Sequence, residues 1–197
     1  YRPLSHFFRQ NFSQVTNPPI DSLRENEVMS LRTRFGNLGN ILDFENLTKE
    51  NIYVLESPIL SNSQFEKFCD FFKKSIKILD CTFDIKSNLK QRLNELRQEA
   101  ELAVREGTKH LVLSDKQVGH KRVIVPMILA IGAINSRLVN LGIRGFSSIN
   151  VQTADALDTH SFAVLLGVGA TTINPYIALD SINQRHQKNL FGKLNYE

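Results

Sequence analysis

The stretch Asp158–Leu179, with the sequence DTHSFAVLLGVGATTINPYIAL, contains one full repeat of the pattern that decides the fold. Apolar residues at i, i+3 and i+4 spacing predict an amphipathic helix that Asp158 or Asp155 caps and Gly167 ends. The β-branched run Thr171–Ile173 predicts a strand, which Pro175 ends because proline lacks a backbone donor. A further helix is expected to follow. The stretch therefore reads as helix, turn, strand and helix.

The same alternation extends back along the chain to about residue 76. Strands are expected at Ile76–Leu79, Leu111–Leu113 and Phe146–Val151, and helices at Leu89–Val104, Pro126–Leu141 and Tyr176–Gln187. The spacing is that of about four βα units, which form parallel sheets, whereas a closed barrel of this type needs eight. The sequence thus predicts an α/β fold in which consecutive βα units form a partial barrel or an open parallel sheet.

Residues 1–75 follow a different pattern and are expected to form a mostly helical N-terminal arm and connector. Two prolines make Gln14–Asp21 a rigid connector, a helix is expected at Leu23–Leu31, and a strand at Ile52–Leu55. This arm, or another domain, must cover a sheet edge that the missing strands would leave open. Residues 76–187 are the βα-repeat region of the same domain, and residues 188–197 are expected to be a frayed tail.

The composition is that of an ordinary globular protein, with 42% hydrophobic and 22% charged residues and a formal net charge of +4. Basic residues are interspersed with acidic ones, which argues against nucleic-acid binding. The longest apolar run, Val123–Ile134, contains a proline and a glycine and is too short to span a membrane. A signal-peptide pattern is not visible, so a cytoplasmic location is expected.

Metal and cofactor chemistry is not expected from the residues themselves. The two cysteines, Cys69 and Cys81, lack CxxC spacing and are too few for a zinc or iron–sulfur site. The glycines of Gly167–Ala170 follow a helix and precede a strand, which is the reverse of a phosphate-binding loop. His160 is expected to form hydrogen bonds at a helix end. The prediction is that the chain holds no catalytic, cofactor-binding or metal-binding residue.

Polar residues nevertheless gather where the predicted strands end. They are Asp80, Thr82, Ser114, Asp115, Lys116, Gln152, Thr153, Asn174 and Tyr176. The carboxyl end of a parallel sheet is where α/β proteins build their sites, so these residues could surround a substrate. The same residue types also satisfy loop backbone and helix N-termini. We favour this second, structural role because only about half of a barrel's strands are visible.

Several strings in the chain carry a resemblance to a known family. They are QVTNPPID at Gln14–Asp21, LGNIL at Leu38–Leu42, SPIL at Ser57–Leu60, LSD at Leu113–Asp115, HSFAVLLGVGA at His160–Ala170 and NPY at Asn174–Tyr176. In this order, and over nearly the whole chain, they resemble the central domain of glutamate synthase large chains. QVTNPPID alone is a specific string.

The resemblance implies an iron–sulfur flavoenzyme of ammonia assimilation, which converts glutamine and 2-oxoglutarate to two glutamates with electrons from NADPH, NADH or ferredoxin. It implies a glutaminase domain before the central domain and, after it, a barrel that carries FMN and the cluster. The implied partners are these flanking domains and either a small NAD(P)H-oxidising subunit or ferredoxin. The family's catalytic residues lie outside the central domain, so none is assigned to a position here.

Three functional hypotheses follow. The first is a central scaffold that joins the glutaminase and FMN domains, helps enclose the ammonia route and is not catalytic alone. The second is an independent small-molecule enzyme or binding protein, with a ligand between Asp80, Asp115, Lys116, Gln152 and Asn174. The third is a protein-docking module.

Overall fold

The computed structural model describes residues 2–9, 24, 29–36, 42 and 52–192 of the 197-residue chain. The chain divides into two compact units. One unit is Gln10–Pro58, and the other joins Tyr1–Arg9 to Ile59–Glu197. The second of these, called the sheet unit below, contains the predicted βα repeats.

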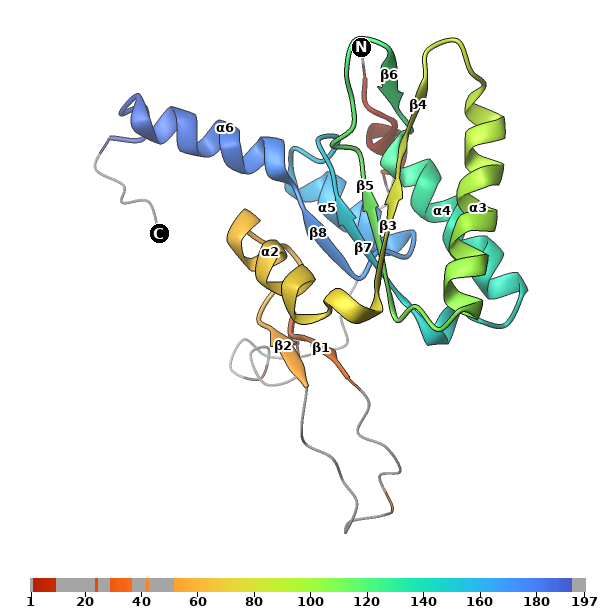
Figure 1. The fold of residues 1–197 in the computed structure, drawn as a ribbon. Helices are drawn as coiled ribbons and strands as arrows, with labels where there is room; N and C mark the ends of the chain where they lie inside the picture. Colours follow the sequence, from red (N-terminus) through yellow and green to blue (C-terminus); the bar gives the residue numbers. More distant parts are fainter. Residues whose placement is uncertain (1, 10–23, 25–28, 37–41, 43–51, 193–197) are drawn as a thin grey trace. The chain divides into compact units, whose positions relative to one another are not determined.

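The sheet unit is built on a four-stranded parallel sheet. Its strands are β3 (Ile76–Asp80), β5 (His110–Ser114), β7 (Ser148–Gln152) and β8 (Thr172–Asn174), in the order β3-β5-β7-β8. The connecting helices are α3 (Leu89–Arg105), α4 (Met127–Asn140) and α5 (Thr159–Gly167), and Figure 1 shows the chain winding through these units in order. Within the described residues the sheet stays open, which confirms the predicted α/β fold in its open-sheet form.

The main core lies between the sheet and these three helices. Alternate strand residues point to the helices, including Leu111 and Leu113 of β5 and Ile149 and Val151 of β7, all with no exposed surface. The helices meet them with apolar faces at helical spacing, such as Ile131, Ile134 and Leu138 of α4. The hydrophobic periodicity read from the sequence therefore corresponds to this packing.

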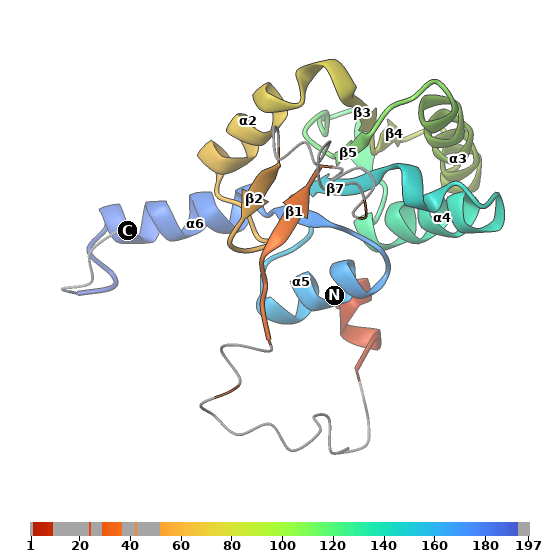
Figure 2. The same ribbon diagram turned by 90° about the horizontal axis from the view of Figure 1, so that it is seen from below.

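The opposite face of the sheet is partly covered by α2 (Asn62–Phe71). This helix begins with a capping box, in which Ser61 and Gln64 satisfy each other's backbone N–H groups. The buried Phe68 ring lies 5.7 Å from the ring of His110, which alternates with Leu111 and so points away from α3–α5. Figures 1 and 2 agree that α2 lies across the sheet from α3 and α4.

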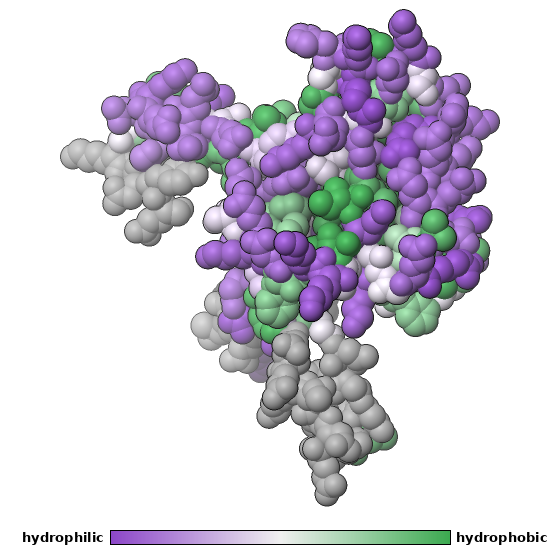
Figure 3. Space-filling model, viewed as in Figure 1, coloured by the Kyte–Doolittle hydropathy of each residue, from purple (hydrophilic) through white to green (hydrophobic). Residues whose placement is uncertain are grey.

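The two edges of the sheet differ. At the β8 edge, Ile59 forms a parallel bridge with Ile173, and the Leu60 N–H donates to the Ile173 carbonyl at 2.8 Å. At the β3 edge, Ile78 has 61% of its surface exposed. Figure 3 shows hydrophobic residues at the surface over the middle of the sheet unit, where β3 and β5 lie. The segment before α2 thus covers the β8 edge, which is one of the two possibilities that the sequence left open, the arm or another domain.

Some local predictions need correction. Gly167 is the last residue of α5, and it is Gly169, with φ +125°, that turns the chain. The third strand begins at Ser148, because Phe146 belongs to a short 3₁₀ helix, η3 (Arg144–Phe146), and is 71% exposed. An antiparallel pair, β4 (Thr82–Asp84) with β6 (Arg122–Ile124), was not predicted. The helix predicted at 176–187 is confirmed as α6 (Tyr176–Gln187).

The rest of the N-terminal arm combines helical turns with strands. Residues Leu4–Phe7 form a 3₁₀ turn, η1, and residues Lys73–Ser75 form another, η2. In the unit Gln10–Pro58, β1 (Thr33–Phe35) pairs antiparallel with β2 (Tyr53–Leu55), which confirms the strand expected there. The connector Gln14–Asp21 lies outside the described residues. Of the helix predicted at 23–31, only residue 24 and residues 29–31 are described, and the latter are not helical.

A membrane-spanning element is not found among the helices of the described residues, since none combines the length and the hydropathy that a bilayer crossing requires.

Candidate functional site at the carboxyl end of the sheet

The nine polar residues predicted at the strand ends do lie at the carboxyl end of the sheet, where their side chains form three groups of polar contacts. The first group is centred on Asp115, which has no exposed surface. Its Oδ2 accepts hydrogen bonds from the Thr153 hydroxyl at 2.7 Å and the Ala154 N–H at 2.9 Å. Its Oδ1 accepts from the Tyr176 hydroxyl at 3.0 Å. Three donors therefore satisfy this buried carboxylate.

Tyr176 is held in its neutral form by this arrangement. Burial raises the pKa of its hydroxyl well above the usual value, and the neighbouring Asp115 adds to the effect. The exposed Lys116 places its Nζ 5.4 Å from the centre of the Tyr176 ring, within the range of a cation–π contact. The first group thus joins the ends of β5 and β7 to the first turn of α6 and carries one cation at its surface.

The second group is a row of amide and hydroxyl side chains across the sheet. The Ser114 hydroxyl donates to Gln152 Oε1 at 3.1 Å, and Gln152 Nε2 donates to Asn174 Oδ1 at 3.1 Å. Asn174 Nδ2 donates in turn to Asn62 Oδ1 at 2.9 Å and to the Leu60 carbonyl at 3.1 Å. The row runs from β5 over β7 and β8 to the start of α2, so it fixes α2 to the end of the sheet.

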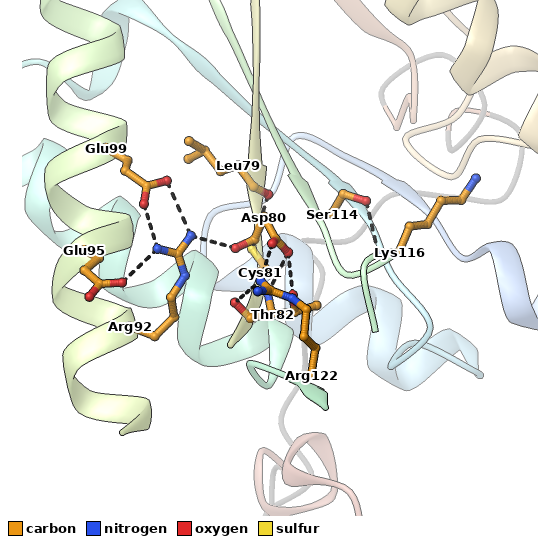
Figure 4. A network of polar contacts seen from close by, with 10 residues as sticks. All are labelled: Leu79, Asp80, Cys81, Thr82, Arg92, Glu95, Glu99, Ser114, Lys116 and Arg122. Carbon is orange, nitrogen blue, oxygen red and sulfur yellow. Dashed lines mark hydrogen bonds and ion pairs between the residues drawn. The ribbon is translucent and has the colours of Figure 1, made fainter. Parts of the chain in front are cut away.

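The third group surrounds Asp80 (Figure 4). Asp80 Oδ1 accepts from the Thr82 N–H at 3.0 Å and from the Thr82 hydroxyl at 2.7 Å, and Oδ2 pairs with Arg122. Arg122 also donates from Nε to the Thr82 hydroxyl at 2.8 Å. From the other side, Arg92 donates to the Asp80 carbonyl at 2.8 Å and pairs with Glu99 at 2.7 Å. Both arginines escaped the sequence analysis, although the β-branched run after Arg122 is a strand signal that could have indicated its place.

A further row of polar side chains lies on the same face of the sheet as Ser114, Gln152 and Asn174, toward the amino ends of the strands. It was not predicted from the sequence. His110 Nδ1 and the Ser148 hydroxyl are 2.9 Å apart, and Asn150 Nδ2 donates to Ser148 Oγ at 2.8 Å. The Thr172 hydroxyl completes the row by donating to Asn150 Oδ1 at 2.8 Å. Burial, with a smaller effect of Lys109, lowers the pKa of His110 to about 4, so the ring is neutral at pH 7. Alternating polar residues in SINVQ, Ser148–Gln152, are the signal that could have revealed this row.

His160 takes the role expected of it. Its Nε2 lies 2.9 Å from the Ser5 carbonyl, which can only accept, so the ring donates this hydrogen bond. The hydroxyls of Ser5 and Ser161 are 3.4 Å apart, and Asp158 caps α5 by accepting from the Ser161 N–H at 2.7 Å. The start of α5 therefore holds the segment around Ser5 against the rest of the sheet unit.

Among the residues that the structure describes, the cysteines and the other potential ligands do not come together in a metal site. A group of three or more metal-ligating side chains is not found in the part of the chain that the structure describes. Burial raises the pKa of the Cys69 thiol to about 11, and burial raises that of the fully buried Cys81 further. Both are thiols at neutral pH. Because an iron–sulfur cluster is held by four cysteine thiolates, the two cysteines of this chain do not fit one.

A polar groove occurs away from the strand ends, between α3 and α4. It has a volume of about 390 Å³. Its lining residues are Asn94, Arg97, Gln98, Ser136, Arg137 and Asn140. None of these is one of the nine residues at the strand ends, so the groove is separate from them. Its Arg137 is paired with Glu101 at 2.7 Å.

Comparison with known proteins agrees with the resemblance noted above. The family described as "Glutamate synthase central domain" matches residues 1–197. The chain is 51% identical over 200 residues to the glutamate synthase [NADPH] large chain of Azospirillum brasilense, covering all of this chain and 13% of that protein. It is 41% identical to the chloroplastic ferredoxin-dependent glutamate synthase of Spinacia oleracea, covering 92% of this chain and 12% of that protein. The Bacillus subtilis (strain 168) glutamate synthase [NADPH] large chain is 35% identical, with the same coverage.

Proposed function

This chain belongs to the glutamate synthase central domain family, and we propose that it acts as a scaffold between the reactive domains of a longer large chain. The parent protein converts glutamine and 2-oxoglutarate reductively to two glutamates. The central domain does no chemistry alone, joins the glutaminase and FMN domains, and helps enclose the ammonia route. The observation that carries this proposal is that the polar side chains at the strand ends bind one another within the domain.

A scaffold must hold its neighbours at a constant separation, and the three groups suit that task. Each group connects segments that are distant in sequence at the carboxyl end of the sheet. Examples are the hydrogen bonds from Ser114 to Gln152 and from Asn174 to the Leu60 carbonyl. The Asp115 group is the clearest case, because three donors satisfy its buried carboxylate, and satisfied buried polar groups make a fold rigid. A rigid layer that excludes water also favours transfer of a reactive intermediate between two sites, because it fixes their positions and limits side reactions.

In this proposal the cofactors and electron donors belong to other parts of the protein. The two cysteines do not fit the iron–sulfur cluster, so we assign the cluster, together with FMN, to the barrel domain. The partners are the flanking domains of the same polypeptide and a small NAD(P)H-oxidising subunit or ferredoxin. The name of one relative gives NADPH and that of another gives ferredoxin as the electron donor. For the protein that contains this chain, we propose a cytoplasmic location.

The alternative of an independent small-molecule enzyme is not favoured. It requires Asp80, Asp115, Lys116, Gln152 and Asn174 to face one ligand. Asp115 and Asn174 have no exposed surface, and Asp80 is paired with Arg122. A ligand would have to displace these contacts and leave buried polar groups unsatisfied, at about 1–3 kcal/mol each.

The proposal is tested in the parent large chain. Lys116→Gln removes the exposed cation at the strand ends and should leave kcat for glutamine-dependent glutamate formation within about threefold of the wild type, since loss of a general acid or base costs about 10²–10⁴-fold. A loss in that larger range would assign chemistry to this domain and overturn the scaffold. The 197-residue chain alone should also lack glutaminase activity, 2-oxoglutarate turnover and FMN retention.

A further inference from the structure

The two ends of the parallel sheet differ in charge. At the carboxyl end, four cationic and five acidic side chains nearly balance, counted over the segments 80–88, 114–122 and 152–158. At the amino end there are six cationic side chains and one acidic side chain, counted over the segments 72–77, 105–110, 141–148 and 168–171. The acidic residue is Glu106, and the cationic ones are Lys73, Lys74, Lys77, Arg105, Lys109 and Arg144. The fold thus gathers at one end basic residues that are interspersed with acidic ones in the sequence.

Backbone hydrogen bonds hold these basic segments side by side. The Lys109 N–H donates to the Ser75 carbonyl at 3.1 Å, and the Ser148 N–H donates to the Lys109 carbonyl at 3.0 Å. Ile76, His110 and Ser148 are partners in register at the start of β3, β5 and β7. Neighbouring strands lie about 4.8 Å apart, so the backbone that carries the cations spans roughly 10 Å across the sheet. Figure 1 shows the turns before these strands together at the lower end of the sheet.

The lysines of this end have no acidic partner among the described residues. All ion pairs between described residues use arginine side chains, including that of Arg105 with Glu101 at 2.9 Å. The four exposed lysines are Lys73, Lys74, Lys77 and Lys109. Cations that follow a helix can serve only to offset its dipole, a role that suits Lys73 and Lys74 after α2. This role does not explain Lys77, which lies within β3, or Lys109, which directly precedes β5.

Arg144 adds a half-buried cation that also lacks a carboxylate partner within the described residues. Its guanidinium donates to Asn135 Oδ1 at 2.6 Å and to the carbonyls of Ser147 and Gly169 at 2.6 and 2.9 Å. These contacts use three of its five N–H groups. A partly buried charge costs free energy unless an opposite charge offsets it. The sheet unit therefore keeps a cation in place at this end without supplying its counter-charge.

Two exposed aromatic rings lie in or beside the same segments. Phe146 is 71% exposed and lies between Arg144 and Ser147, the residue whose carbonyl Arg144 contacts. Phe71, the last residue of α2, is 52% exposed and lies two residues before Lys73. Aromatic residues and arginine are enriched in the contact surfaces of protein complexes. The amino end thus combines a concentrated positive charge with apolar rings, which is the composition of a protein-docking surface.

We propose that this basic end docks on an acidic surface of another domain of the parent large chain. It consists of Lys73, Lys74, Lys77, Lys109, Arg144 and Phe146. The proposal rests on the proposed function, in which the chain is one part of a longer protein, as it is of the Azospirillum relative, of which it covers 13%. Complementary charge selects an acidic partner. A shared polypeptide raises the effective concentration of that partner to the order of millimolar, so exposed ion pairs around one apolar ring are sufficient to hold it.

Carbodiimide cross-linking of the complete parent large chain, purified without other subunits, tests this docking, because the reagent joins lysine amines to carboxylates in direct contact. Mass spectrometry should find links from the four lysines to Asp or Glu residues outside these 197 residues. Lys109→Glu reverses a charge in the middle of the basic end and should lower the yield of links from Lys73 and Lys74 about fivefold. Lys86→Glu reverses an exposed charge at the opposite end of the sheet and should leave that yield within about twofold.

Four results would overturn the proposal. They are links confined to carboxylates within this chain, links between two separate copies of the large chain, equal yields in Lys109→Glu and Lys86→Glu, and lysines that resist acetylation but form no link. The last result would point to a phosphate-bearing partner such as a nucleic acid. Hydrogen exchange of α4 amides shows whether Lys109→Glu has kept the core, and Lys77→Glu provides a second variant. Cross-linking does not require turnover, so a wild type that forms no glutamate would contradict the proposed function without deciding the docking.

Discussion

The Tyr176 hydroxyl donates a 3.0 Å hydrogen bond to Oδ1 of Asp115, which lies 61 residues earlier in the chain. This contact joins the first turn of α6 to the end of β5. It also supplies one of the three donors that satisfy a carboxylate with no exposed surface. The contact thus connects α6 to the one acidic side chain that is fully buried among the described residues.

Tyr176→Phe should destabilise the protein by about 1–3 kcal/mol, because it leaves an oxygen of the buried Asp115 without its donor. Urea unfolding gives the difference in free energy of unfolding. Lys116→Ala is the matched control, since it removes only the cation–π contact at the surface and should cost at most about 1 kcal/mol. Equal losses for the two variants would contradict a structural role for the hydroxyl.

Gly169→Ala should be strongly destabilising, by about 1–3 kcal/mol or more. Gly169 has φ +125°, and an added Cβ would lie 2.6 Å from Cγ of Asn135. That side chain has little freedom to move, because Arg144 Nε donates to its Oδ1 at 2.6 Å.

Gly167→Ala is the control for this prediction. Gly167 is helical, and a Cβ there meets nothing within 4 Å, so alanine should be neutral or stabilising by up to about 1 kcal/mol. Thermal unfolding of both variants measures the contrast. A smaller loss at Gly169 than at Gly167 would show that the turn tolerates a side chain.

Acidification should destabilise the protein through His110. The pKa of the folded-state ring is about 4, because burial disfavours its charged form, whereas the unfolded ring titrates near 6.5. Between these values the unfolded state binds more protons, so this contribution is fully present above pH 6.5 and is lost as the pH falls toward 4.

Urea unfolding from pH 7 to 4 measures this dependence. His110→Gln should flatten the slope of stability against pH, whereas His120→Gln, at an exposed position, should keep it. An unchanged slope in His110→Gln would mean that other groups cause the acid sensitivity.

His160→Ala should release the segment around Ser5, because it removes the 2.9 Å hydrogen bond to the Ser5 carbonyl. The cost is expected to be about 0.5–1.5 kcal/mol, typical of one hydrogen bond. Hydrogen exchange should increase at the Phe8 amide, which donates to the same carbonyl, and not in β5 or β7. Uniform exchange changes would instead indicate global destabilisation.

Much of the fold could be predicted because its signals are local. The caps at Asn88 and Asp158 and the positive-φ glycines Gly107 and Gly142 lie beside the helices that they limit. Apolar periodicity then identified each helix of the repeat region. Prediction failed at Gly167 and Gly169, because two glycines near one helix end gave competing stop signals. It also failed at β4 and β6, because each of these strands depends on a partner about forty residues away.

The sequence by itself thus determined the order of the four parallel strands and their helices from residue 76 onward, the parallel α/β class, and which polar residues reach the strand ends. Only the tertiary structure decided that these residues bind one another, that α2 covers the second face, and that α6 turns away from the sheet. Helical and strand periods are properties of near neighbours. The partners of Ser114 and Ser5 lie 38 and 156 residues away, and no local pattern specifies which distant donor will meet which acceptor.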